Sequence, residues 1–224
     1  MDFYDQLVRD TEAERLALYQ VPLIRDAAAG AISRATYQAY LTQAYHHVKH
    51  TTPLLMATGA RLRSDQEWLR DAIAEYIEEE LGHQEWILND IAACGGDKEA
   101  ARHSMPNAAT EMMVAYAYDT VMRGNPMGFF GMVFVLEGTS TALATNIAET
   151  LMQSLQLPRK AFTYLLSHGT LDLSHMDFFK GLMNRIENPE DQAAILHMAK
   201  RMFVLFADMF RSVPHPSQEV SHAA

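Results

Sequence analysis

The feature that most constrains the fold of this chain is a series of long segments rich in Ala, Leu, Met, Glu and Gln, separated by short breaks. These residues favour helix. Runs of alternating Val, Ile and Thr are missing, and so are the Asn-Gly and Asp-Gly pairs that turn β-hairpins. We therefore predict an all-α fold of seven helices joined by short links. From the prolines, glycines and capping residues, the helices are expected at about residues 3–20, 33–53, 64–94, 109–122, 125–155, 158–186 and 188–213.

The chain is long enough to bury a substantial core in one domain. It has 224 residues, of which 49% are hydrophobic and 21% are charged, as is usual for a globular protein. No internal repeat divides it. We predict a single helical domain at residues 1–213, followed by a flexible tail at 214–224.

The charge balance restricts the partners. The formal net charge is -10, from 18 Lys and Arg against 28 Asp and Glu, and no basic cluster offsets it. Such a surface repels phosphate groups, so neither nucleic acid nor an anionic membrane is an expected partner. The single cysteine, Cys94, excludes an intramolecular disulfide and fits a reducing compartment. With no signal peptide and no apolar stretch judged long enough to span a bilayer, a cytoplasmic protein is expected.

A first group of chemically interesting residues lies in the segment Glu-Glu-Glu-Leu-Gly-His. Glu80 and His83 are three residues apart, so on one helix they would share a face. Helices of ferritin-like two-iron bundles offer one oxygen and one nitrogen ligand at this spacing. Taken alone, the motif is more often a solvated acidic helix face.

A second candidate is the isolated Glu137. The residues before it, 129–136, are apolar on every face of two helical turns, which indicates a buried helix. A buried carboxylate costs several kcal/mol unless it is paired, hydrogen-bonded or bound to a metal. Pairing with an Arg, or a place at the wetter end of the helix, would explain Glu137 equally well.

The third group is His168, Asp172 and His175. Spacings of four and three residues put all three on one stripe of a continuous helix. Two imidazoles with a carboxylate between them suit iron, zinc or manganese. A chance arrangement among ten His, or a helix break at Gly169, is the competing explanation.

The three groups together form a balanced set of donors. They supply three carboxylates and three imidazoles from three helices, which is the number of ligands that a carboxylate-bridged pair of metals needs. A structural zinc would prefer four ligands, often with cysteine. The mixture of oxygen and nitrogen donors favours iron or manganese. The predicted metal ligands are Glu80, His83, Glu137, His168, Asp172 and His175.

In these motifs the chain resembles the haem-oxygenase-like di-iron oxidases and oxygenases of the TenA/pyrroloquinoline-quinone-synthase-like superfamily. The resemblance covers nearly the whole chain, and His-x-x-x-Asp-x-x-His is its most specific part. It implies a haem-oxygenase-like helical bundle that carries the six ligands above. The first carboxylate is the most variable one in the family, and Glu79 is the alternative to Glu80.

The resemblance also implies a function. The expected cofactor is Fe(II), two per chain, with O2 as co-substrate and a small organic molecule, such as a carboxylic or amino acid, as substrate. Tyr76 and His50 are speculative additional site residues. A homodimer is expected, as in relatives of this fold.

Two alternatives stay open at this point. One is a metal-free enzyme of the same fold, such as a TenA-like thiamine-salvage hydrolase, but that reaction needs a nucleophilic cysteine. Cys94 lies at a predicted helix C-terminus, where the helix dipole disfavours a thiolate. The other is a non-catalytic binding protein. A haem oxygenase is not expected, because the N-terminal helix, which holds the axial His in those enzymes, contains no His.

Overall fold

The computed structural model describes residues 2–215, apart from the side chains of residues 168–175. This part of the chain contains α-helices, three short 3₁₀ helices and no strand, which confirms the all-α prediction. The elements are α1 (Phe3–Asp10), α2 (Glu12–Tyr19), α3 (Pro22–Ala28), α4 (Arg34–Val48), α5 (Thr51–Ala60), η1 (Ser64–Leu69), α6 (Arg70–Glu80), α7 (His83–Ala93), α8 (Lys98–His103), α9 (Ala108–Arg123), η2 (Pro126–Gly128), α10 (Phe129–Leu155), η3 (Arg159–Ala161), α11 (Thr163–Asn184) and α12 (Pro189–Ser212).

The helices outnumber the predicted seven because several long segments are broken internally. The first breaks at Thr11, whose hydroxyl donates a hydrogen bond to the Leu7 carbonyl at 2.7 Å and so competes with the helical pattern. The second breaks at Lys49 and His50. Pro53 therefore lies in the first turn of α5, where its missing N–H costs nothing. The helix break at Gly169 that we considered as a competing explanation does not occur, and α11 runs continuously over its 22 residues.

The break that matters most for function separates Glu80 from His83. Glu80 is the last residue of α6 and His83 is the first residue of α7. Between them Gly82 has φ 89°, a left-handed conformation that a residue with a Cβ adopts only with strain. The prediction that both residues lie on one helix is therefore wrong, although they still meet in space.

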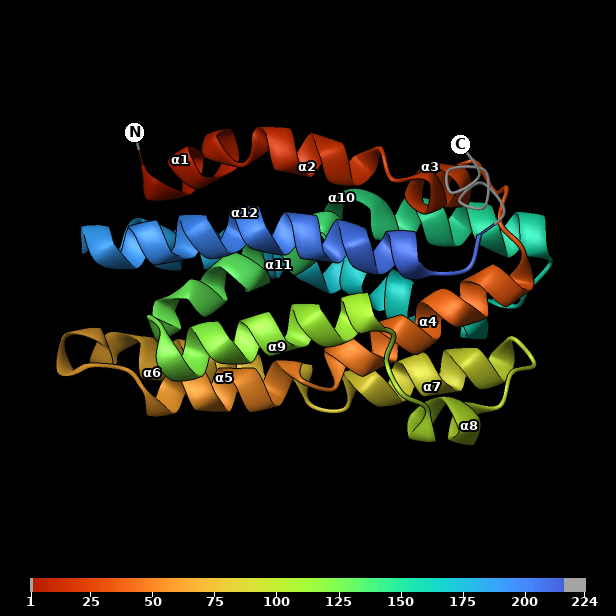
Figure 1. Cartoon of the computed structure of the whole chain (residues 1–224), viewed down its shortest axis with the longest axis horizontal. Helices are drawn as coiled ribbons and strands as arrows, with labels where there is room; N and C mark the ends of the chain where they lie inside the picture. The colour runs from red at the N-terminus through yellow and green to blue at the C-terminus, as the bar shows by residue number, and fades with distance from the viewer. Residues whose placement is uncertain (1, 216–224) are drawn as a thin grey trace.

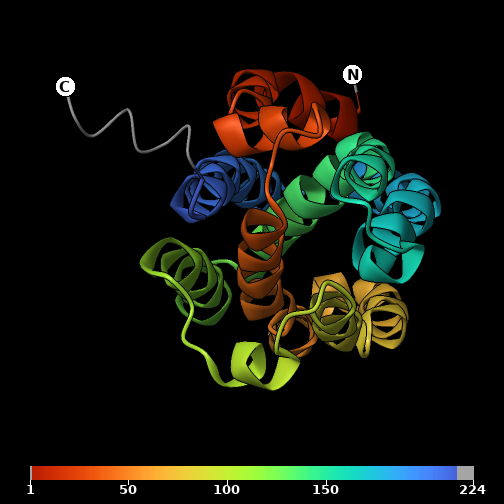
Figure 2. The same cartoon turned by 90° about the vertical axis from the view of Figure 1, so that its right-hand side faces the viewer.

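The long apolar helix α10 is central to the packing. It contacts α11, α12 and α3, while α4 packs against α7 and α9. Viewed end-on, α1–α3 cover one side, and α9, α12, α11, α7 and α6 surround α4 and α10 (Figure 2). The crossing of α10 and α12 is close because of Gly131, where a Cβ would lie 2.3 Å from the Ile195 carbonyl oxygen. The lengthwise view shows α12 between α1–α2 and α9 (Figure 1).

Helix α10 corrects one expectation from the sequence. By length and composition the segment Pro126–Leu155 could cross a membrane, contrary to our prediction that no segment reaches that length. However, 67% of its most apolar window is buried inside the protein. Packing against neighbouring helices therefore accounts for its apolar character.

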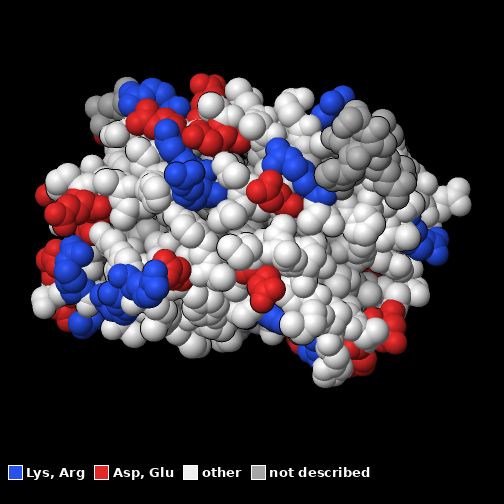
Figure 3. Space-filling view, in the orientation of Figure 1, with Lys and Arg blue, Asp and Glu red and all other residues white. Residues whose placement is uncertain are grey.

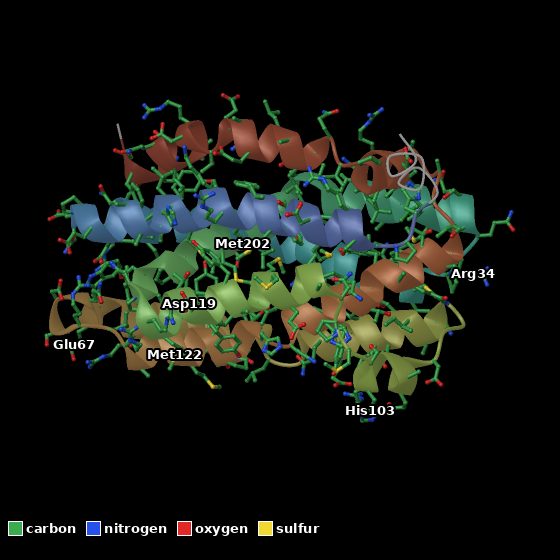
Figure 4. The ribbon with its side chains drawn as sticks, viewed as in Figure 1. Arg34, Glu67, His103, Asp119, Met122 and Met202 are labelled. Atoms are coloured by element: carbon green, nitrogen blue, oxygen red, sulfur yellow. The ribbon has the colours of Figure 1, made fainter. Side chains whose placement is uncertain are left out.

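Polar and apolar side chains separate as the helical pattern requires. Arg34, Glu67 and His103 point outward, whereas Met202 is fully buried along the border between α12 and α9 (Figure 4). On the face shown in Figure 3, acidic and basic side chains are interspersed around uncharged surface. The predicted tail begins with described residues: His215 is buried and shares a hydrogen bond of 2.7 Å with Asp26, and residues 216–224 lie outside the described part.

Candidate metal centre

Two of the predicted ligands, Glu80 and Glu137, line the same cavity. This cavity has a volume of about 60 Å³, and we call it the acidic cavity. Both side chains are buried, with exposed fractions of 8% and 9%. Glu79, the alternative to Glu80, is exposed to solvent. The structure thus brings together two carboxylates that are 57 positions apart in sequence, and it favours Glu80 over Glu79 as the inward-facing residue.

A third predicted ligand, His83, is hydrogen-bonded to Glu80. Its Nδ1 lies 3.1 Å from Glu80 Oε2, so a neutral His83 donates a hydrogen bond from Nδ1 to that carboxylate. Such a bond fixes the tautomer in which Nε2 carries the lone pair, which is how metal-binding histidines are commonly oriented. The His83 ring also lies 4.0 Å from the Trp86 ring, centroid to centroid. Contacts with Glu80 and with Trp86 therefore hold the His83 ring in one orientation.

The rest of the described lining of the acidic cavity is largely apolar. The described lining residues include neither Lys nor Arg. Two carboxylates in such surroundings are costly unless a positive charge compensates them. A divalent metal fits this requirement. The lining residues other than Glu80 and Glu137 are His47, Val48, Thr51, Phe129, Met132, Val133, Leu136, Ser140, Tyr164 and Phe206.

The described carboxylates and imidazoles do not make a complete metal site by themselves. Among the side chains that the structure describes, no group of three or more His, Cys, Asp and Glu is close enough to hold an ion. The predicted ligands His168, Asp172 and His175 lie outside the described side chains. A metal centre at Glu80 and Glu137 therefore needs ligands from α11.

The start of α11 is fixed beside the acidic cavity by a buried carboxylate. Asp90 of α7 accepts hydrogen bonds from the backbone N–H groups of Thr163 (3.0 Å) and Tyr164 (2.8 Å). These N–H groups have no partner within the helix, so Asp90 caps it. Burial raises the pKa of Asp90 to about 6, against the lowering effect of these two bonds. Because Tyr164 also lines the acidic cavity, Asp90 anchors one wall of it.

The sequence analysis missed one inward-facing histidine and favoured another that faces elsewhere. His47 lines the acidic cavity, is buried, and packs edge-on against Phe206. His50 instead shares a hydrogen bond of 3.1 Å with the Tyr118 hydroxyl on α9. The three histidines of the segment Tyr-His-His-Val-Lys-His could not be ranked without knowing that α4 ends at Val48.

The other speculative residue, Tyr76, is buried on the inner face of α6, one turn before Glu80. Its ring lies 5.8 Å from that of Phe178 on α11. It is not among the described residues that line the acidic cavity. Tyr76 therefore joins α6 to α11 next to the candidate ligands.

Cys94 has the properties of a structural residue. It is buried at the C-terminal end of α7, and its carbonyl accepts a hydrogen bond from the Gln38 side chain at 2.9 Å. Burial, with a further contribution from Asp90, raises the pKa of its thiol to about 11. The thiol is thus protonated at neutral pH, which argues against a cysteine nucleophile.

Comparison with known proteins places the chain in a family. Residues 38–207 match the sequence model described as "Iron-containing redox enzyme". The chain belongs to the iron-containing redox enzyme family. The match includes every predicted ligand, from Glu80 to His175. No curated protein matches this family member significantly.

Solved structures confirm the haem-oxygenase-like fold. A domain of unknown function with a heme oxygenase-like fold from Shewanella denitrificans has a TM-score of 0.87 and 23% identity, over 100% of this chain and 97% of that one. A TenA homologue from P. horikoshii has a TM-score of 0.78 and 11% identity, over 95% and 98% of the two chains. Heme oxygenase from Leptospira interrogans has a TM-score of 0.75 and 16% identity, over 94% and 98%. At these identities the likeness concerns the fold alone.

Proposed function

We propose that this protein is a non-haem enzyme that holds two iron ions and uses O2 to oxidise a small organic substrate. The observation that carries the proposal is the acidic cavity, whose wall brings together two buried carboxylates of the predicted ligand set, Glu80 and Glu137. The family match, which concerns iron-containing redox enzymes, supports it.

The residues that would hold the metal come from three places in the fold. Glu80 and His83 flank the α6–α7 break, Glu137 lies on α10, and the remaining ligands lie on α11. On a helix, positions 168, 172 and 175 continue the stripe that begins at Tyr164, which lines the acidic cavity. We therefore expect this stripe to complete the six-ligand set.

The chemistry divides between the metal and the chain. Ferrous iron supplies electrons to O2 and open positions for the reactants when it is bound. Glu80 and Glu137 supply the negative charge that retains a divalent ion, and the bond to Glu80 keeps His83 in its ligating tautomer. The apolar side chains of Phe129, Met132 and Leu136 exclude water from the site.

The test is iron binding and oxygen consumption by paired variants. Glu137→Gln keeps the size of the side chain and removes its charge, and Asp191→Asn makes the same change at a buried carboxylate that is not among the described lining residues of the cavity. We expect wild type and Asp191→Asn to retain iron and to consume O2 after anaerobic loading with Fe(II). Glu137→Gln should fold, retain far less iron and consume little O2. Equal iron content in the two folded variants would refute the assignment.

A further inference from the structure

A second cavity adjoins the acidic one. It has a volume of about 70 Å³, and we call it the apolar cavity. The two cavities share three lining residues, Ser140, Tyr164 and Phe206. A ligand that enters the apolar cavity would therefore have one end next to the candidate metal centre.

The described lining of the apolar cavity carries no charge. It contains no Asp, Glu, His, Lys or Arg, and two of its hydroxyls already have backbone partners. The Tyr37 hydroxyl donates to the Ala161 carbonyl at 3.0 Å, and the Thr139 hydroxyl donates to the Val135 carbonyl at 2.6 Å. A charged group placed here would lose its hydration without a compensating partner. The cavity thus suits an uncharged apolar group.

The apolar cavity follows one face of α10. Its lining residues on that helix recur at helical spacing from Ser140 through Ala144 and Ile147 to Leu151. At 1.5 Å per residue, Leu151 lies about 16 Å along the helix from Ser140. Glu137 lies about one turn beyond Ser140 in the opposite direction. The cavity is therefore elongated, and it leads away from the carboxylates.

The end of this cavity that lies farthest from Glu137 is lined by Leu151, which is 1% exposed. Next to it, the turn after α3 lies against the last turns of α10, because a Cβ on Gly30 would lie 3.1–3.2 Å from atoms of Ser154 and Thr150. Leu23, Ile24 and Ala27 of α3 complete the wall. A ligand that reached beyond this wall along α10 would have to displace these side chains.

We propose that the apolar cavity binds the unbranched, uncharged tail of the substrate and that Ala144 and Leu151 determine the accepted tail length. This inference rests on the proposed function, since the head of the substrate would lie at the candidate metal centre. The substrate class is accordingly a straight-chain molecule whose reacting end is opposite an apolar tail. Ala144 limits the width of the cavity near the carboxylates, and Leu151 limits its length.

The test uses metal-free protein, so that it does not depend on the oxidation reaction. The probes are straight-chain primary alcohols from hexanol upward, and calorimetry measures their binding. For wild type we expect affinity to rise about fourfold per methylene up to one chain length and then to fall sharply. Leu151→Ala should move this maximum to a longer chain. Ala144→Leu should weaken binding of the preferred alcohol at least tenfold.

The matched control is Ala142→Leu, which adds the same side chain to an exposed position of the same helix. It should bind alcohols like wild type. Affinity without a length maximum, or a maximum that Leu151→Ala leaves in place, would overturn the inference. If those results came with normal iron binding and O2 consumption, only the tail-binding role would be lost. A length-limited alcohol site in a protein that takes up no iron would confirm the tail cavity and refute the oxidase proposal.

Discussion

Two regions of this protein bury carboxylates in opposite ways. Asp191, at the start of α12, is 2% exposed and accepts hydrogen bonds from Arg63 (2.9 Å), Gln66 (2.8 Å) and Asn125 (2.7 Å). Burial opposes ionisation, but these three donors hold the pKa of Asp191 below its usual range. The chain itself therefore compensates this charge.

The acidic cavity surrounds its carboxylates differently in the part of the chain that the structure describes. Glu80 and Glu137 face a described lining that includes neither Lys nor Arg, and the partner resolved for Glu80 is a histidine. The same chain thus pairs one buried carboxylate with an arginine and places two others in the wall of a cavity. This difference fits the proposed function, in which Asp191 serves the fold and Glu80 and Glu137 would hold the metal ions.

The largest effect should come from Glu80→Gln. Loss of a ligand charge, with a neutral amide oxygen as the remaining acceptor for His83, should lower iron affinity at least about a hundredfold, while the fold is retained. Glu79→Gln, one residue away and exposed, is the matched control and should bind iron like wild type. Iron content per chain after desalting measures both. Loss of iron in Glu79→Gln alone would reverse the choice between the two residues.

The complementary change, Arg63→Ala, removes the cationic partner of the structural carboxylate Asp191. It leaves Asp191 buried without its cation and should lower the free energy of unfolding by about 2–3 kcal/mol, a value that allows for the partial exposure of Arg63. Urea denaturation measures the change. Iron content should be unaffected, so a loss of iron here would remove the contrast between the two regions.

A third buried carboxylate, Asp90, should make the free energy of unfolding depend on pH. Its pKa in the folded protein, about 6, lies above the ordinary value of 3.8. The protonated carboxyl therefore contributes stability at low pH that is lost as the pH rises through about 6. Compared with Asp90→Asn, wild type should lose about 2–3 kcal/mol of stability between about pH 4 and pH 7. Parallel pH profiles of unfolding for the two proteins would contradict this assignment.

The smallest effect is expected at His50. His50→Ala removes the hydrogen bond to Tyr118 and should cost about 1 kcal/mol. Iron content and oxygen consumption should stay at the wild-type level, because His50 faces α9. Thermal unfolding measures the cost, and a selective loss of oxygen consumption would restore His50 as a site residue.

The sequence predicted the helical class and the inward position of Glu137, because apolar residues on every face of a helix require burial. It also paired Glu80 with His83, but for the wrong reason. The pair meets across a break at Gly82 and not along one helix. A Gly inside a helical pattern is compatible with either outcome, and tertiary packing decides between them.

The position of His47 could not be predicted in the same way. His46, His47 and His50 occupy neighbouring positions, and which one faces the cavity depends on where α4 ends and on how it lies against α12. The capping role of Asp90 likewise joins residues 73 positions apart. Such contacts depend on the arrangement of whole helices, and spacing within one segment carries no information about them.

The central claim is that the acidic cavity is half of a two-iron site. The most direct measurement is an anaerobic titration of metal-free wild-type protein with Fe(II), followed by calorimetry and checked by iron content after desalting. The account predicts saturation at two irons per chain. Saturation at one iron would contradict the two-metal assignment, and no uptake by folded protein would contradict the metal site altogether.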